Sequence, residues 1–164
     1  MSNARRCRRT WEQTKGPERY EMSKFPTFNC STAGAPSNNL CVLLVDDDEV
    51  FRRGLADNLR EDGHAVFEYA APDEVPQSAF DAVSVVVTDF ELPGHDGLGF
   101  AEHVHAVQPR LPVVLVTARP DALASMDARA RSSVSLVQKP VDYQRLHRLL
   151  HTLVAATALT QPLS

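Results

Sequence analysis

Apolar runs alternate with segments of helical periodicity from residue 40 almost to the end of the chain. The runs are short and rich in valine and leucine, which is typical of strands covered on both faces of a parallel sheet. Strands are therefore predicted at residues 40–45, 64–69, 83–88, 113–116 and 134–137.

Helices are predicted between these strands. After the first strand, Phe51, Leu55 and Leu59 recur every four residues. Asp48 is a suitable N-cap for this helix, and Gly63 is a suitable C-terminal stop. Further helices are expected at 98–104, 119–131 and 143–154, with a loop at 93–97 and at most a short helix within 72–80, which Pro76 interrupts.

This order of elements predicts the α/β class, with a doubly wound, five-stranded parallel sheet in a three-layer α/β/α sandwich. Right-handed crossovers leave few topologies, of which the flavodoxin-like order 2-1-3-4-5 is the expected one. In open sheets of this kind, ligands bind beyond the carboxyl ends of the strands. The residues that follow the predicted strands are therefore the first candidates for chemistry.

Charged and hydroxyl side chains stand at four of these strand ends. They are Asp46 and Asp47 after the first strand, Asp89 after the third, Thr117 after the fourth and Lys139 after the fifth. Converging carboxylates repel by about 4 kcal/mol per pair at about 4 Å and an effective dielectric near 20. A lysine together with Mg²⁺, which prefers oxygen ligands, balances such charges. The set therefore indicates a phosphoryl-transfer site.

Charge is divided unevenly along the chain, whose formal net charge is −4. Residues 1–38 contain seven Lys or Arg and three Glu, so the remainder of the chain is acidic. An acidic compact domain disfavours nucleic acid as a partner and suits a protein that gathers carboxylates around a cation. Residues 1–39 lack periodicity and are expected to form a disordered basic tail, with a second tail at 158–164.

The cysteine spacing and the hydropathy of the chain argue against a disulfide-rich, cysteine-metal or membrane-spanning protein. The three cysteines, Cys7, Cys30 and Cys41, have neither metal-binding spacing nor the density of a disulfide scaffold, and Cys41 is expected to be a small core residue. No apolar run reaches the roughly 18 residues of a membrane span. A soluble, cytoplasmic protein without a membrane partner is the expectation.

The ordered motifs resemble the receiver domain of two-component response regulators over residues 40–157. They are Val45-Asp-Asp47, Asp89-Phe-Glu-Leu-Pro-Gly-His-Asp-Gly97, Val116-Thr-Ala118 and Lys139-Pro140. Each motif alone is common, whereas the ordered set on four strands is specific. The resemblance also implies a cis peptide bond before Pro140.

The resemblance implies a phosphoryl acceptor, a Mg²⁺ site and a switch. Asp89 would accept a phosphoryl group from a phosphohistidine on a sensor histidine kinase or a histidine phosphotransfer protein. Catalysis would be limited to the protein's own phosphorylation and dephosphorylation, through positioning and charge neutralisation, so an enzyme is not expected. The implied residues are Asp46, Asp47, Asp89 and the backbone carbonyl of Glu91 for Mg²⁺, and Thr117, the Ala118 amide and Lys139 for the phosphoryl oxygens.

Three positions depart from the family pattern or add to it. Leu136 stands where the family usually has an aromatic that changes rotamer, so that switch is absent. Glu91 adds an acid at the mouth of the site, and Arg119 is expected to pair with it and to modulate the lifetime of the phosphate.

No output domain is expected after the last helix, so a stand-alone receiver that binds a downstream protein is predicted.

Other interpretations stay open on the sequence. Asp46 and Asp48 also fit the first motif of haloacid-dehalogenase-like phosphatases, although that hypothesis leaves Asp89 unexplained. A degenerate receiver could act as a phosphorylation-independent interaction module. His147 and His151 lie four residues apart on the last helix, but no acidic third metal ligand accompanies them, so a metal site there is not favoured.

Overall fold

One parallel sheet of five strands organises the computed structural model, which describes residues 39–119, 121, 124 and 126–160. The strand order is β2-β1-β3-β6-β7. The strands are β1 (Cys41–Val45), β2 (Ala65–Tyr69), β3 (Val85–Asp89), β6 (Val113–Thr117) and β7 (Ser135–Gln138). Numbered within the sheet, this is the predicted order 2-1-3-4-5, and the fold prediction is confirmed.

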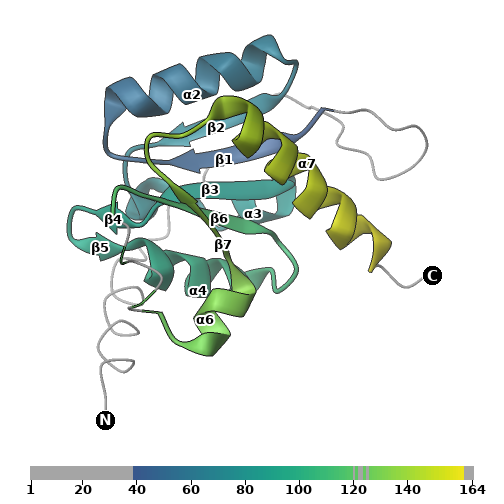
Figure 1. Ribbon diagram of the computed structural model, residues 1–164. Coiled ribbons are helices and arrows are strands. Elements are labelled where there is room, and N and C mark those ends of the chain that lie inside the picture. Colours follow the sequence, from purple (N-terminus) through teal and green to yellow (C-terminus); the bar gives the residue numbers. More distant parts are fainter. Residues whose placement is uncertain (1–38, 120, 122–123, 125, 161–164) are drawn as a thin grey trace.

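Helices cover both faces of the sheet (Figure 1). On one face lie α2 (Glu49–Glu61) and α7 (Tyr143–Leu159). On the other lie α3 (Ala79–Ala82), α4 (Gly97–Val107) and α6 (Ala128–Ser133), with a short 3₁₀ turn (Pro72–Glu74) before α3. The molecule is therefore the three-layer sandwich expected from the alternation of strands and helices.

Alternate strand residues enter two separate apolar cores. Val42 and Leu44 of β1 face α2 and α7, whereas Leu43 of the same strand faces α4. Leu146 and Leu150, one turn apart on α7, have no exposed surface. Because both sides of each central strand are buried, the strands are continuously apolar rather than alternating.

The ends of α2 are formed by the residues expected from the sequence. The Asp48 carboxylate accepts hydrogen bonds from the backbone amides of Val50 and Phe51, at 3.0 and 3.1 Å, and so caps the helix. Gly63 follows the helix with a φ of 89°, a left-handed conformation that glycine adopts without steric cost. Both predictions for this helix are confirmed.

A small hairpin replaces the loop that was expected at 93–97. β4 (Glu91–Leu92) and β5 (His95–Asp96) pair antiparallel across Gly94, whose φ is 72°. Two paired residues per strand are too few for periodicity to reveal, so the sequence pattern gave no signal for this hairpin.

The helix expected from Arg119 to about Arg131 was wrong at its start and is not continuous, although Ala124 is helical and α6 (Ala128–Ser133) covers its end. Arg119 is not helical, and α6 begins only at Ala128 because Asp127 has an extended backbone and its carboxylate caps the Ala130 amide at 2.8 Å. A chain that adopts the extended conformation at a cap cannot continue a helix through it. At the carboxyl end of the chain, α7 continues to Leu159.

Cys41 is buried in β1 and is disulfide-bonded, so its expected role as a plain core residue was incomplete. Of the tails expected at 1–39 and 158–164, residues 1–38 and 161–164 lie outside the described residues, while Ala158 and Leu159 belong to α7. Among the described helices, none has the length and hydropathy needed to cross a membrane.

Candidate functional site

The parallel register of three strands brings acid and hydroxyl side chains to one edge of the sheet. Asp46 follows β1, Asp89 ends β3 and Thr117 ends β6. Their exposed fractions are 1%, 8% and 0%, so all three are buried at the carboxyl ends of the central strands. Asp47 is exposed beside them. Carboxylate oxygens of the three aspartates lie within 4.8 Å of one another.

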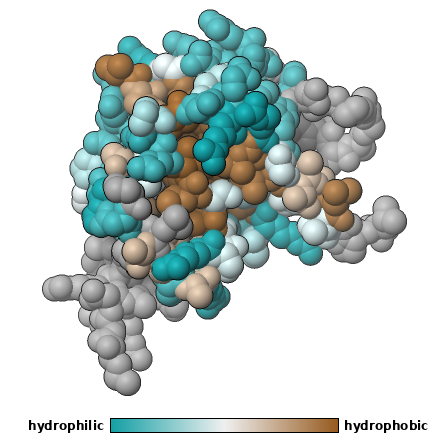
Figure 2. All heavy atoms as spheres, viewed as in Figure 1, coloured by the Kyte–Doolittle hydropathy of each residue, from teal (hydrophilic) through white to brown (hydrophobic). Residues whose placement is uncertain are grey.

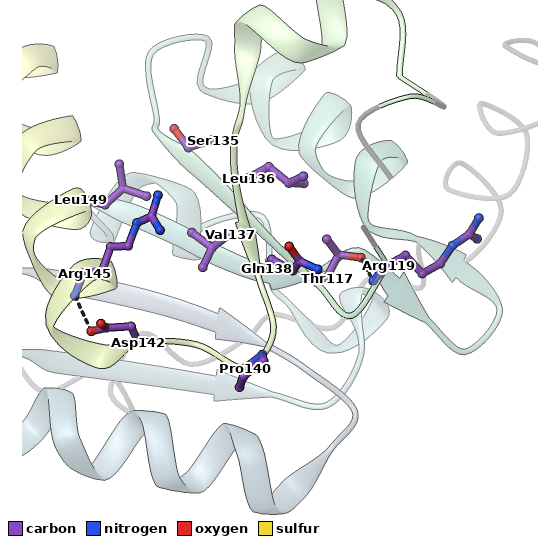
Figure 3. Close-up of a pocket in the computed structure, with 10 residues that line it drawn as sticks. All are labelled: Thr117, Arg119, Ser135, Leu136, Val137, Gln138, Pro140, Asp142, Arg145 and Leu149. Atoms are coloured by element: carbon purple, nitrogen blue, oxygen red, sulfur yellow. Dashed lines mark hydrogen bonds between the residues drawn. The ribbon is translucent and has the colours of Figure 1, made fainter. Parts of the chain in front are cut away.

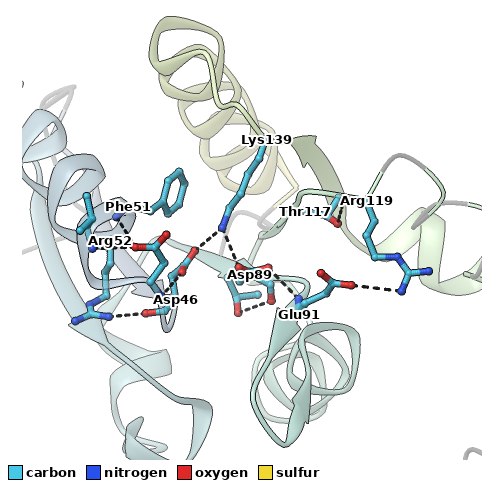
Figure 4. A network of polar contacts seen from close by, with 11 residues as sticks. Asp46, Phe51, Arg52, Asp89, Glu91, Thr117, Arg119 and Lys139 are labelled. Carbon is cyan, nitrogen blue, oxygen red and sulfur yellow. Dashed lines mark hydrogen bonds and ion pairs between the residues drawn. The ribbon is translucent and has the colours of Figure 1, made fainter.

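Lys139 connects two of these acids (Figure 4). Its Nζ lies 2.9 Å from Asp89 Oδ2 and 3.1 Å from Asp46 Oδ2. The Lys139 amide donates to the Thr117 carbonyl at 2.7 Å, which holds the end of β7 beside the end of β6. The peptide bond before Pro140 is cis, as expected. All five strand-end residues singled out in the sequence therefore lie at the same edge of the sheet.

Burial and charge act in opposite directions on this cluster. Burial raises the pKa of Asp46, while the Asp48 amide and Lys139 act to lower it. Burial alone would lower the pKa of Lys139, but its hydrogen bonds and charge contacts with Asp89 and Asp46 outweigh this effect and raise it. The ammonium group is therefore held charged between two carboxylates.

Two neighbours of this cluster were not assigned from the sequence. The Lys139 ammonium lies 4.3 Å from the centre of the Phe51 ring, a cation–π contact. Arg52 donates through Nη1 to the Asp46 carbonyl and also pairs with Glu68 at 3.6 Å. Helical periodicity marked Phe51 only as an apolar position, because the approach of a lysine from 88 residues away leaves no local signal.

Gly97, the last residue of the motif that begins at Asp89, is a third residue to which the sequence assigned no role. Its amide donates to the Phe90 carbonyl at 3.0 Å, so the start of α4 lies against the loop after β3. A Cβ at this position would lie 2.1 Å from the Asp89 carbonyl oxygen and 2.8 Å from Phe90 Cα. A residue with any side chain would therefore displace the backbone that carries Asp89.

The mouth of the site carries a second charge cluster. Arg119 Nη1 lies 3.3 Å from Glu91 Oε1, the pair expected from the sequence, and its Nη2 lies 3.0 Å from Asp121 Oδ2. These contacts, led by the hydrogen bond to Asp121, raise the pKa of Arg119. The Glu91 amide donates to Asp89 Oδ1 at 2.9 Å. The pair therefore lies directly beside the buried acid, while its side chains are half exposed.

Thr117 and Ala118 lie between these two clusters. Thr117 Oγ1 accepts the Arg119 amide at 2.9 Å, and Ala118 is exposed at the end of the strand. A groove lined by polar and apolar side chains begins at Thr117 and runs along β7 to α7, and its apolar lining includes Leu136 of β7 and Leu149 of α7 (Figure 3). On this face, apolar side chains gather between α7 and α6 (Figure 2). Leu136 is partly buried there.

The donor set suits a hard divalent cation. Mg²⁺ takes oxygen ligands and keeps several waters, and the three aspartates offer carboxylate oxygens beside an open mouth. Asp48, by contrast, uses its carboxylate to cap α2, so it is not available as the second acid of a haloacid-dehalogenase motif. The geometry therefore favours a receiver over that alternative.

Comparison with known families agrees with this geometry. The model of the response regulator receiver domain matches residues 42–151. The chain belongs to this family. Its receiver domain is a signalling module of two-component systems, and the match covers every strand-end residue described above.

Curated relatives of this receiver are response and transcriptional regulators. It is 35% identical over 124 residues to the response regulator protein FleR of Pseudomonas aeruginosa, covering 73% of this chain and 25% of that protein. It is 30% identical over 115 residues to the C4-dicarboxylate transport transcriptional regulatory protein DctD of Rhizobium meliloti, covering 70% and 24%. The chain thus spans about a quarter of the length of these relatives.

Solved receiver structures have the same fold. A receiver domain protein of Clostridium thermocellum superposes with a TM-score of 0.66 at 20% identity, over 74% of this chain and 99% of that one. A putative response regulator of Chloroflexus aurantiacus gives 0.62 at 26% identity, over 71% and 98%. These likenesses support the three-layer fold independently of the sequence motifs.

Proposed function

We propose that this receiver accepts a phosphoryl group on Asp89 from a phosphohistidine of a sensor histidine kinase or histidine phosphotransfer protein. The observation that carries the proposal is the convergence of Lys139 Nζ on Asp89 and Asp46 at 2.9 and 3.1 Å, at the carboxyl edge of the sheet. Asp89 is buried at 8% exposure, and Asp46, Asp47 and Lys139 lie beside it. A buried acid that only stabilised the fold would not need three charged neighbours.

Asp46, Asp47, Asp89 and the backbone carbonyl of Glu91 are the proposed ligands of Mg²⁺. The ion would neutralise charge on the phosphoryl oxygens when it is bound. Asp89 supplies the attacking carboxylate oxygen, and Lys139 holds a negative oxygen of the incoming group with its ammonium. No separate base is needed, because the attacking carboxylate carries no proton.

Thr117 and the Ala118 amide are the proposed sensors of the phosphoryl group. The acyl phosphate carries about −1.5 to −2 charges in place of one, and its oxygens accept hydrogen bonds that a carboxylate cannot reach. The Thr117 hydroxyl would turn toward one of these oxygens and leave its contact with the Arg119 amide. Because Thr117 and Arg119 also line the groove along β7, this movement would change the surface there.

We propose that a downstream protein reads this groove and that the receiver signals through such phosphorylation-dependent binding. Leu136 and Leu149 provide apolar contact area in the groove, and Arg145 provides a charge beside it. Leu136 cannot change between inward and outward ring positions as an aromatic would. The change in the groove would therefore come from Thr117 and Arg119 rather than from residue 136.

Acetyl phosphate and Mg²⁺ test this function directly. Intact mass measurement should show a gain of one phosphoryl group on the wild-type chain and no gain on Asp89→Asn. Asp57→Asn, which changes an exposed aspartate on α2, is the matched control and should be modified like the wild type. If neither acetyl phosphate nor any phosphohistidine donor modifies the wild type, the chain is a degenerate receiver.

Turnover separates the receiver from the phosphatase hypothesis. A haloacid-dehalogenase-like enzyme would hydrolyse an excess of p-nitrophenyl phosphate, whereas this receiver should take up one phosphoryl group per chain. Sustained hydrolysis that depends on Asp48 would contradict the proposal.

Removing the Glu91–Arg119 pair should shorten the lifetime of the phosphate. The pair covers the approach to Asp89 from the mouth of the site, so Glu91→Ala and Arg119→Ala should each speed autodephosphorylation by about two- to tenfold, at most ~1.4 kcal/mol of barrier. Loss of phosphate is followed by mass after removal of the donor. Asp121→Ala keeps both members of the pair and is the control. Unchanged rates in both variants would show that the pair does not screen water.

A further inference from the structure

Three histidine side chains meet at the edge of the sheet opposite the phosphoryl site. His64 directly precedes β2, and His147 and His151 lie one turn apart on α7. His64 Nε2 lies 2.9 Å from His147 Nε2, and His151 Nε2 lies 3.3 Å from the same atom. Ligand nitrogens of all three histidines lie within 4.8 Å of one another. Segments 83 residues apart in the chain therefore converge on one point.

This spacing is that of a metal coordination shell. Zn²⁺ binds histidine nitrogens at about 2.0–2.1 Å in a tetrahedron, which places neighbouring nitrogens about 3.3 Å apart. Asp62 lies at the border of this cluster and offers an oxygen from one side, because its Oδ2 lies 3.7 Å from His147 Nε2. The acidic ligand that appeared missing from the sequence therefore comes from the residue after α2.

We propose that His64, His147 and His151 bind one divalent transition-metal ion of the Zn²⁺ class, with the Asp62 carboxylate as the fourth ligand. This site is separate from the Mg²⁺ site and does not depend on the proposed function. Three of its four ligands are nitrogens, which Zn²⁺ accepts readily and Mg²⁺ does not. The hydroxyl of Tyr143 donates to Asp62 Oδ2 at 2.5 Å and orients that carboxylate.

The surroundings of His64 and His151 favour the neutral form that binds metal. Burial, followed by the neighbouring histidines, lowers the pKa of His64, and burial and His147 lower that of His151. His64 is nearly buried at 5% exposure, while His147 and Asp62 stay accessible to an entering ion, with side-chain exposures of 25% and 46%. Metal binding should therefore weaken on acidification, as the imidazoles take up protons.

Zinc binding would break one hydrogen bond of the metal-free protein. The Leu40 amide donates to His64 Nδ1 at 3.0 Å, so in the metal-free protein the proton of neutral His64 is on Nε2. Coordination through Nε2 requires that proton to move to Nδ1, which breaks the hydrogen bond from Leu40. The loss of one such bond lowers affinity by about tenfold, which three histidines and a carboxylate can offset. A change of tautomer at His64 is therefore a specific signature of this site.

Zinc titration of the full chain, freed of metal with a chelator and kept in excess Mg²⁺, tests the proposal. Competition with a chromophoric chelator should show one Zn²⁺ per chain, together with a raised thermal midpoint, since the ion would join α7 to the start of β2. His147→Gln and His151→Gln should each weaken Zn²⁺ binding by at least about tenfold. His103→Gln, which removes a histidine packed on Phe80 outside the cluster, should leave it unchanged.

Two further measurements distinguish the histidine site from the aspartate cluster and do not depend on whether the histidine variants fold. Asp89→Asn should bind Zn²⁺ as the wild type does. Long-range ¹H–¹⁵N spectra of the wild type should show the His64 proton on Nε2 without Zn²⁺ and on Nδ1 with it. The site does not exist if the wild type fails to bind Zn²⁺ in excess Mg²⁺ or if the His147 and His151 variants bind it equally well. A proton retained on His64 Nε2 in the zinc-loaded protein would equally overturn the three-histidine assignment.

Discussion

Replacing Gly97 with alanine should lower the free energy of unfolding by at least about 3 kcal/mol and should slow phosphorylation of Asp89. The added Cβ would lie 2.1 Å from the Asp89 carbonyl oxygen, and that neighbour is backbone, which cannot turn aside as a side chain does. Overpacking in a rigid region typically costs about 1–3 kcal/mol, and this overlap is more severe than usual. Urea denaturation and the acetyl phosphate assay measure the two effects.

Gly54→Ala is the matched control, because the same chemical change has the opposite expectation there. Gly54 lies on the exposed side of α2 with no atom within 4 Å of its potential Cβ. Alanine in a helix interior is favoured over glycine by about 1 kcal/mol, so this variant should be slightly more stable. If Gly97→Ala unfolded and took up phosphate like the wild type, the close packing of α4 on the Asp89 loop would be refuted.

The fold could be predicted because the same burial pattern recurs in every central strand and every long helix. Each central strand is buried on both faces and therefore appears as a continuous apolar run, and each long helix presents an apolar stripe to one core. Segments without such repetition were predicted poorly. The β4–β5 hairpin is too short to show a period, and the start of α6 depends on one backbone conformation at Asp127.

The candidate site could be located for a different reason. In a parallel sheet the carboxyl ends of the strands meet at one edge, so Asp46, Asp89 and Thr117 are neighbours once the strand order is known. Contacts made by residues inside helices follow no such rule. The ring of Phe51 beneath Lys139, and the distance from Asp62 and His64 to the histidines of α7, are set by tertiary packing alone.

Replacing Lys139 with methionine should have the largest effect on chemistry, because it removes one charge from the centre of the cluster. Phosphorylation of Asp89 should fall by about 10²–10³, the usual effect of losing a group that binds developing negative charge. In buffer without Mg²⁺ the variant should lose about 3 kcal/mol of stability, since Asp46 stays buried at 1% exposure without its cation. Mass measurement and denaturation at several Mg²⁺ concentrations report the two results.

The same variant should bind Mg²⁺ at least about tenfold more tightly than the wild type, because the ammonium that repels the ion from the carboxylates is absent. Added Mg²⁺ should therefore narrow the gap in stability between the two proteins. A second substitution separates charge from packing. Lys139→Met with Asp89→Asn removes one of the carboxylates that Lys139→Met leaves without a cation, so it should be more stable than Lys139→Met alone. If the double variant were the less stable of the two, the lysine would act in this protein mainly by filling space, and the electrostatic account of the site would fail.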